Sequence, residues 1–382
     1  MDFNELYELE RQARKEGNVE ALKDIFLRMV QLCGDDREVI SLIRVLASRR
    51  GQDRNSIKWL IKEVYKKEEE FARSILSEVV EGKMYLEAER IAITLDLKEK
   101  YEAQGDIKKA LEIILDVPVE TFTMIPEMTI VKYQLEQFRL CVEVQDWVRA
   151  DITMKKIRKK YFVENEAIED ELLFYKYIVD LYLGQEKFFE ASSTYLKLNE
   201  IADNKESTIL ASFFGILCSC EGEKKDVRIQ KRELLTKLAN DKNNEEGMRL
   251  FLDRFLSSLV IEKQAVGSIM SIVNRYKNVD NYLPFVLRAV DEHNFFIVEK
   301  FYATVSISTC SKLLDVDSED LINRISFMVN NGLSTAKINQ KEGLVVFGDK
   351  KWNSDVGDVL NKLIKVDHMI HKENLKKIIR NE

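Results

Sequence analysis

The chain has 382 residues, a formal net charge of −7 and five scattered cysteines. Its length exceeds the roughly 250–300 residues that a single hydrophobic core serves, so two domains or an elongated repeat array are expected. The acidic balance argues against a general binder of polyanions, and the odd number of cysteines suits a reducing compartment, the cytosol or nucleus. We expect neither a signal peptide nor a transmembrane segment, because no apolar run approaches the roughly 18 residues that cross a bilayer.

The first 240 residues predict a helical repeat array. Only three prolines and 14 glycines interrupt the whole chain, and apolar residues recur at helical spacing between polar breaks. The breaks that share one form begin at Gly17, Gly82, Gly105, Gln145 and Gly184. The last three are 40 and 39 residues apart, which is the length of an antiparallel helix pair with its turns. Such TPR-like pairs stack into an α-solenoid, which we place at residues 1–240.

Small residues have a predicted role in each pair. Glycine before the second helix can take the left-handed conformation that ends the first helix. Alanine in the second helix lets two helix axes approach closely. The alanines at this position are Ala88, Ala110, Ala150 and Ala191.

The second domain is predicted at residues 241–350 and consists of a helical bundle that leads into a winged helix at residues 302–348. A β-branched run at residues 302–307 is followed by helices at 309–314 and 318–330, with Asn331-Gly332 as a stop signal. Strands are expected at residues 335–338 and 344–347, joined by a hairpin loop that contains a glycine.

The helix predicted at residues 318–330 has an acidic surface, which argues against DNA binding. Asp317, Glu319 and Asp320 face only Arg324 along this helix and its cap. Affinity for nucleic acid comes mainly from Lys and Arg that neutralise phosphates. A winged helix used for packing against other proteins is therefore favoured over one that binds DNA.

The last segment, residues 351–382, predicts a closing helix over 354–379. Its apolar residues recur at intervals of four, three and four, the stripe of a helix that packs on other helices. They are Val359, Leu363, Val366 and Ile370. The helix either folds back on its own solenoid or joins helices of other chains.

No motif of a catalytic, metal or cofactor site is found. Only His293, His368 and His371 occur, without an HExxH motif, a CxxC pair or a Gly-rich phosphate loop. We read the Cys218–Cys220 pair as part of an apolar helix rather than a metal ligand set, and His368 and His371 as a surface pair. The basic run at residues 155–160 is interpreted as a solvated helix face, with an acidic partner as the alternative. We expect no enzyme, cofactor, nucleic-acid partner or membrane partner.

A helical solenoid that leads directly into a winged helix and a terminal helix resembles the PCI family, shared by the proteasome lid, the signalosome and a translation initiation-factor complex. The winged-helix hairpin Thr335–Phe347 carries this general likeness. Three further stretches are similar to one type of noncatalytic lid subunit and favour the lid over the signalosome. They are Leu111–Phe122, Lys132–Phe162 and, after Trp352, His368–Leu375. The likeness covers most of the chain from about residue 85 onward.

The resemblance implies a noncatalytic scaffold in the cytoplasm and nucleus. Its implied partners are other PCI subunits of the lid, the lid metalloprotease deubiquitinase, the proteasome core and the ATPase ring. Winged helices of neighbouring subunits would extend a sheet between chains, for which the edge-strand candidates are Leu344, Val345, Val346 and Phe347. Terminal helices would gather into a bundle that buries Val359, Leu363, Val366 and Ile370. A signalosome subunit and a nucleic-acid-binding PCI adaptor are the alternatives.

Overall fold

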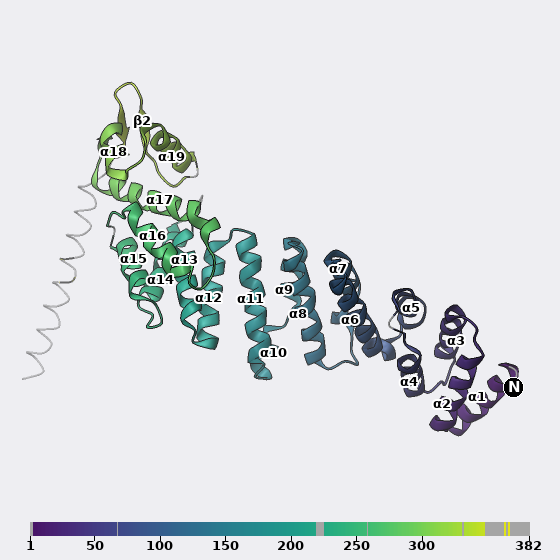
Figure 1. Cartoon of the computed structure of the whole chain (residues 1–382). Coiled ribbons are helices and arrows are strands. Elements are labelled where there is room, and N and C mark those ends of the chain that lie inside the picture. Colours follow the sequence, from purple (N-terminus) through teal and green to yellow (C-terminus); the bar gives the residue numbers. More distant parts are fainter. Residues whose placement is uncertain are drawn as a thin grey trace, which may run out of the picture. The chain divides into compact units, whose positions relative to one another are not determined.

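The computed structural model describes residues 3–66, 68–218, 225–257, 259–330, 332–347, 363 and 366. The chain divides into two compact units, Met1–Ala202 and Asp203–Glu382. Helices dominate both units, and the three described strands lie in the second, so the predicted mostly helical fold is confirmed (Figure 1). The division falls one helix pair before the boundary expected near residue 240. That boundary and the one at residue 350 stay predictions.

The first unit is an array of helix pairs in which α1 packs on α2, α6 on α7, α8 on α9 and α11 on α12 (Figure 1). Its α-helices are α1 (Phe3–Glu16), α2 (Val19–Leu32), α3 (Asp36–Ser48), α4 (Arg54–Val64), α5 (Glu69–Ser74), α6 (Glu87–Ala103), α7 (Ile107–Leu115), α8 (Glu127–Glu143), α9 (Trp147–Lys156), α10 (Lys159–Glu164), α11 (Ile168–Gly184) and α12 (Phe188–Ala202). A π-helix, Ile75–Val80, continues α5, and short 3₁₀ turns cover Met84–Leu86 and Val119–Thr121.

One local geometry joins the two helices of a pair. Gln145 ends α8 in the left-handed region at φ 63°, and the N–H of Asp146 donates to the Cys141 carbonyl at 2.9 Å. The Asp146 carboxylate then accepts from the Arg149 N–H at 3.1 Å and so caps α9. Asp146 therefore satisfies a carbonyl of one helix and an N–H of the next. Asp106 does the same between α6 and α7, after Gly105 at φ 79°.

The break expected at Gly184 lies two residues later. Gly184 is still helical, and the left-handed residue is Glu186 at φ 56°, after which Lys187 donates to the Tyr182 carbonyl at 2.9 Å. Glycine at 184 has a packing role instead, because the indole ring of Trp147 lies where a Cβ would be. The expected pattern named the right turn but the wrong residue, since several residue types adopt a left-handed cap.

Close packing of alanine is found in three of the four pairs. Ala110, Ala150 and Ala191 have no exposed surface. Ala88 is exposed, so the prediction that it lies between two helix axes was wrong. At this break Leu86, just before α6, is the residue with no exposed surface.

The second unit has a helical part and a small sheet. Its elements are α13 (Lys205–Leu217), α14 (Lys225–Ala239), α15 (Glu246–Leu256), α16 (Lys263–Val273), a 3₁₀ turn (Asp280–Tyr282), α17 (Leu283–Phe301), β1 (Thr304–Ser306), α18 (Ile307–Leu314), α19 (Ser318–Asn330), β2 (Lys337–Asn339) and β3 (Leu344–Val346). From β1 onward this is the predicted order of strand, two helices and hairpin. Asp315 at φ 51° ends α18, and Gly332 at φ 70° follows α19 as expected, while Asn331 lies outside the described residues.

The core around the sheet joins α17 to the strands. Val345, the middle residue of β3, has no exposed surface. Phe347 packs on Phe295 of α17 with 5.5 Å between ring centroids. Cys310 of α18 and Ile325 of α19 belong to the same buried cluster. Burial of these side chains fixes both helices against the sheet.

Candidate protein interface

The described sheet has the strand order β1-β3-β2, and both pairs are antiparallel. Val345 of β3 pairs with Val305 of β1 and with Ile338 of β2. The ladder continues beyond β1, where the Phe347 N–H donates to the Ala303 carbonyl at 2.9 Å. β3 is therefore the central strand.

This strand order shows that the strand predicted to lie at the edge of the sheet lies in its centre. Leu344, Val345, Val346 and Phe347 were predicted to form a strand with a free edge, but the strand that contains them has a partner on each side. The apolar run reads as a strand, yet its position in the sheet depends on β1, which lies some 40 residues earlier in the chain. Among the described residues, the outer strands are β1 and β2, and each pairs on one side only.

The helix α19 has an acidic first turn, and its one basic residue forms an ion pair with α17. Glu319 and Asp320 are exposed in its first turn, and the Asp317 carboxylate accepts from the Glu319 N–H at 3.3 Å. Arg324 forms an ion pair with Asp291 of α17. Burial lowers the pKa of Arg324, yet the guanidinium stays protonated at neutral pH because its ordinary pKa lies far above neutrality. The only basic residue of the helix is thus already paired.

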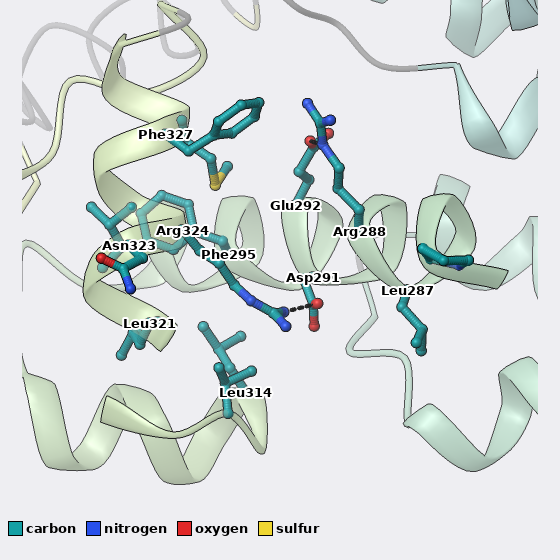
Figure 2. Close-up of a pocket in the computed structure, with 14 residues that line it drawn as sticks. Leu287, Arg288, Asp291, Glu292, Phe295, Leu314, Leu321, Asn323, Arg324 and Phe327 are labelled. Atoms are coloured by element: carbon teal, nitrogen blue, oxygen red, sulfur yellow. Dashed lines mark hydrogen bonds and ion pairs between the residues drawn. The ribbon is translucent and has the colours of Figure 1, made fainter. Parts of the chain in front are cut away.

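A groove of about 510 Å³ lies between α17 and α19. Figure 2 shows the Arg324 guanidinium directed at Asp291 across this groove, with Phe327 on the same helix. The Arg288 guanidinium lies over the Phe327 ring, 4.3 Å from its centroid, and its Nε is 3.0 Å from a Glu292 carboxylate oxygen. The charged groups pair with one another, so the rest of the lining is mainly apolar. Of these groove residues the sequence indicated only Arg324, because the groove forms where α19 packs on α17 and that packing is not visible in either helix alone.

The structure describes part of the predicted stripe on the terminal helix. Leu363 is 62% exposed and Val366 is 47% exposed. Val359 and Ile370 lie outside the described residues, as do Trp352, His368 and His371. The two described members of the stripe therefore present apolar surface to solvent.

The described histidine and cysteine that the sequence offered as possible metal ligands pack inside the helical part of the second unit. His293 of α17 packs on Phe255 with 4.5 Å between ring centroids, its Nε2 is 3.0 Å from the Leu259 carbonyl, and burial lowers its pKa. Cys218 is buried, while Cys220 lies outside the described residues. Within the described ranges, no group of three or more His, Cys, Asp or Glu side chains could hold a metal ion.

The basic run at residues 155–160 is partly paired within the chain. Lys155 pairs with Asp151 at 2.6 Å and Lys156 with Glu120 at 2.7 Å. Arg158 lies 3.4 Å from Glu127. The choice between a solvated face and an acidic partner stays open. Of the helices that are described, none is long and apolar enough to cross a membrane.

Two family models match the chain. One described as PSMD12/CSN4, N-terminal covers residues 3–207, and one described as PCI domain covers residues 249–349. The first begins at residue 3 and so covers nearly all of the segment before residue 85, in which no stretch carried the family resemblance. The second includes α17, the sheet and the groove.

Named relatives extend over nearly the whole chain. The 26S proteasome non-ATPase regulatory subunit 12 of Dictyostelium discoideum is 23% identical over 95% of this chain and 87% of its own length. Its homolog A in Arabidopsis thaliana is 24% identical over 96% of this chain and 94% of its own. The 26S proteasome regulatory subunit RPN5 of Saccharomyces cerevisiae is 22% identical over 98% and 91%.

These relatives confirm the likeness to one lid subunit, the fifth non-ATPase subunit of the regulatory particle, that the central and terminal stretches indicated. The first match covers the array of helix pairs, and the second covers the described sheet and the helices next to it. The chain belongs to the PSMD12/CSN4 family and carries a PCI domain in its second half.

Proposed function

We propose that this chain is a noncatalytic scaffold subunit of the 26S proteasome lid, in the cytoplasm and nucleus. It would help to assemble the lid and to place its metalloprotease deubiquitinase for ubiquitin-dependent protein degradation. The observation that carries the proposal is a PCI-domain sheet whose outer strands, β1 and β2, each pair on one side only within the described chain. The names of relatives that align with nearly all of the chain support the choice of complex.

The outer strands support a specific mode of contact. An extended strand of a neighbour can add to an unpaired edge through main-chain hydrogen bonds. Two outer strands allow one neighbour on each side of the subunit. β2 is taken as one docking edge because it contains no proline, so that its outward main-chain groups are open to pairing. Leu344–Phe347 would then support the interface from the centre of the sheet.

The terminal helix supplies a second contact in this proposal. Leu363 and Val366 are exposed, and with Val359 and Ile370 they form the stripe predicted to enter a helical bundle. The core particle, the ATPase ring and the deubiquitinase are proposed as further neighbours. The chemistry of the degradation machine would belong to those other chains.

Two alternatives are tested with the same preparation. A signalosome subunit is a candidate because the matching family model carries both the PSMD12 and the CSN4 name. A nucleic-acid adaptor is disfavoured, since Glu319 and Asp320 are exposed on α19 and Arg324 is paired with Asp291.

The test is a gentle affinity purification from native extract with nucleotide present, followed by sizing and a peptidase assay. A lid subunit elutes in a megadalton particle with ATP-stimulated peptidase activity. Elution in a smaller complex that has deneddylase activity and lacks the ATPase ring would select the signalosome. Purified chain that binds a labelled duplex with a steep salt dependence would support the adaptor instead.

A further inference from the structure

Two apolar surfaces of the second unit lack a cover in the described structure. One is the groove between α17 and α19, in which the exposed ring of Phe327 and the half-buried Leu287 stand beside buried core side chains, among them Leu314, Val316, Ile325 and Met328. The other is the stripe of the terminal segment, whose described members, Leu363 and Val366, are exposed. The Phe327 ring at the groove and the two stripe residues are large apolar side chains left open to solvent within one unit, and each could be covered by the other.

The chain leaves the described sheet close to the groove. Phe347, where the continuous described chain ends after β3, packs edge-on against Phe295, and the Phe295 side chain lines the groove. Leu363 follows Phe347 by 16 residues. A segment of that length spans at most roughly 50 Å when extended. This is long enough for Leu363 to reach the groove, because Phe295, which packs on Phe347, already lines it.

The spacing of the stripe suits a groove. Val359, Leu363, Val366 and Ile370 stand at positions i, i+4, i+7 and i+11. An amphipathic helix that lies in an apolar groove inserts residues with this periodicity. Arg324 and Asp291 are paired with each other within the groove. The apolar lining is therefore the main source of affinity for a docked helix.

Charge complementarity favours the same occupant. Asp317, Glu319 and Asp320 are exposed between the groove residues Val316 and Leu321. The segment 354–379 carries four acidic residues, two of them in its first turns, and five lysines, all from Lys362 onward. The part of the helix from Lys362 onward is net basic and therefore fits an apolar groove with an acidic rim.

We infer that, in the free chain, the segment 354–379 docks in the groove between α17 and α19 and buries its own apolar stripe there. The groove would thus be an intramolecular binding site for the terminal helix. One consequence rests on the proposed lid assembly. A partner that recruits the terminal helix into a bundle would uncover the groove, so the two contacts would compete for one helix.

The first test uses hydrogen exchange on the full-length purified chain. Leu363→Asp with Val366→Asp is expected to speed exchange of the α19 amides about tenfold, the effect of losing the burial of roughly one aliphatic side chain. Asn361→Asp with His368→Asp adds the same two charges on the opposite face of a helix and is expected to leave α19 unchanged. Equal exchange of α19 in the wild type and both variants would overturn the proposal.

The second test is an oxidative crosslink in dilute full-length chain. Asn323 lines the groove and is exposed, so Asn323→Cys with Leu363→Cys is expected to form an intramolecular disulfide. Ser326→Cys with Leu363→Cys is the control, because Ser326 is exposed on the same helix outside the groove lining. Crosslinked dimers, or equal yields from both pairs, would refute docking within one chain. Neither test requires other lid subunits, so lid assembly can fail while docking holds.

Discussion

The indole ring of Trp147, the first residue of α9, occupies the space over Gly184, the last residue of α11. A Cβ at residue 184 would lie 2.8 Å from Cε2 of the ring and closer still to Cζ2 and Cη2. This contact joins two helix pairs of the first unit, so the glycine is needed for space rather than for an unusual backbone angle.

Gly184→Ala is expected to destabilise the first unit by about 1–3 kcal/mol, because the ring or a helix must move to make room. Urea unfolding followed by tryptophan fluorescence measures the change. Gly267→Ala in α16 is the matched control, since no atom lies within 4 Å of its new Cβ. It should stabilise the second unit by about 0.5–1 kcal/mol. Equal stability of Gly184→Ala and the wild type would contradict the packing role.

The left-handed cap at Gln145 predicts a stabilising substitution. A non-glycine residue at φ 63° carries a steric cost that glycine avoids, so Gln145→Gly is expected to stabilise the α8–α9 pair by about 0.5–1 kcal/mol. Gly105→Ala at φ 79° reverses the comparison and should destabilise the α6–α7 pair by about 1 kcal/mol. Thermal unfolding of both variants is the measurement. The same sign of change for both would refute this account.

Arg139 of α8 is the centre of an ion-pair network. It pairs with Glu136 and Glu143 at 2.7 Å each and with Glu102 of α6, while Lys98 lies 3.0 Å from Glu102. The side chains of Arg139 and Glu136 are 28% and 25% exposed, so their charges are only partly hydrated. Arg139→Met removes a partner from three carboxylates, of which only Glu102 and Glu136 keep Lys98, and should cost about 1–3 kcal/mol of unfolding free energy.

The control for the Arg139 prediction is Arg44→Met, which breaks a pair with Glu78 at 3.7 Å between mostly exposed side chains. That change should stay within about 0.5 kcal/mol of the wild type. Chemical unfolding of both variants compares the two sites. A similar loss at both would mean that the network adds nothing beyond ordinary surface pairs.

The network also predicts a pH dependence. Burial alone would raise the pKa of Glu136, but hydrogen bonds from Arg139 and Lys98 outweigh it and lower the pKa below its ordinary value. The stability that this carboxylate adds is therefore complete above about pH 4.5, its range in the unfolded chain. It is lost as the pH falls through the lower pKa of the folded state.

Glu136→Gln should therefore be less stable than the wild type at pH 7, and the difference should shrink below about pH 4.5. Urea midpoints between pH 7 and pH 3 measure it. Glu112→Gln, at a residue outside the network, is the control and should follow the wild type across the range. A difference between Glu136→Gln and the wild type that grows on acidification would overturn the sign of this prediction.

The proposed docking edge at β2 can be tested with proline. In a strand, successive N–H groups point to opposite sides, so one of Lys337 and Ile338 donates toward β3 and the other toward the open edge. Proline at the outward position should leave the fold intact and abolish incorporation into the lid, because it removes a donor and crowds the edge. Proline at the other position should lower the melting temperature.

Incorporation is measured by affinity purification of tagged variants from native extract. Gln340→Pro, in the hairpin loop, is the control and should enter the complex normally. If both β2 variants are folded and still enter the complex, strand addition at β2 is wrong. The proposed scaffold role could then still rest on the β1 edge or the terminal helix.

The sequence by itself determined the helical class, the turn positions and the order of elements from β1 to β3. These features depend on local periodicity and on the capping preferences of residues such as Asp146 and Gly332, which lie within one or two turns of what they terminate. The resemblance to the family was also present in short segments. All of these signals are local in the chain.

Only the tertiary structure decided which strand is central, which glycine serves packing and where a groove forms. β3 is central because it pairs with β1, which lies much earlier in the chain, as well as with β2, and hydrophobic periodicity cannot reveal which strands pair. Gly184 looks like any turn glycine until Trp147 of another pair lies over it. The Arg324–Asp291 pair likewise depends on how α19 packs on α17. Contacts between distant segments are set by the burial of many side chains together, and no short stretch of sequence encodes that burial.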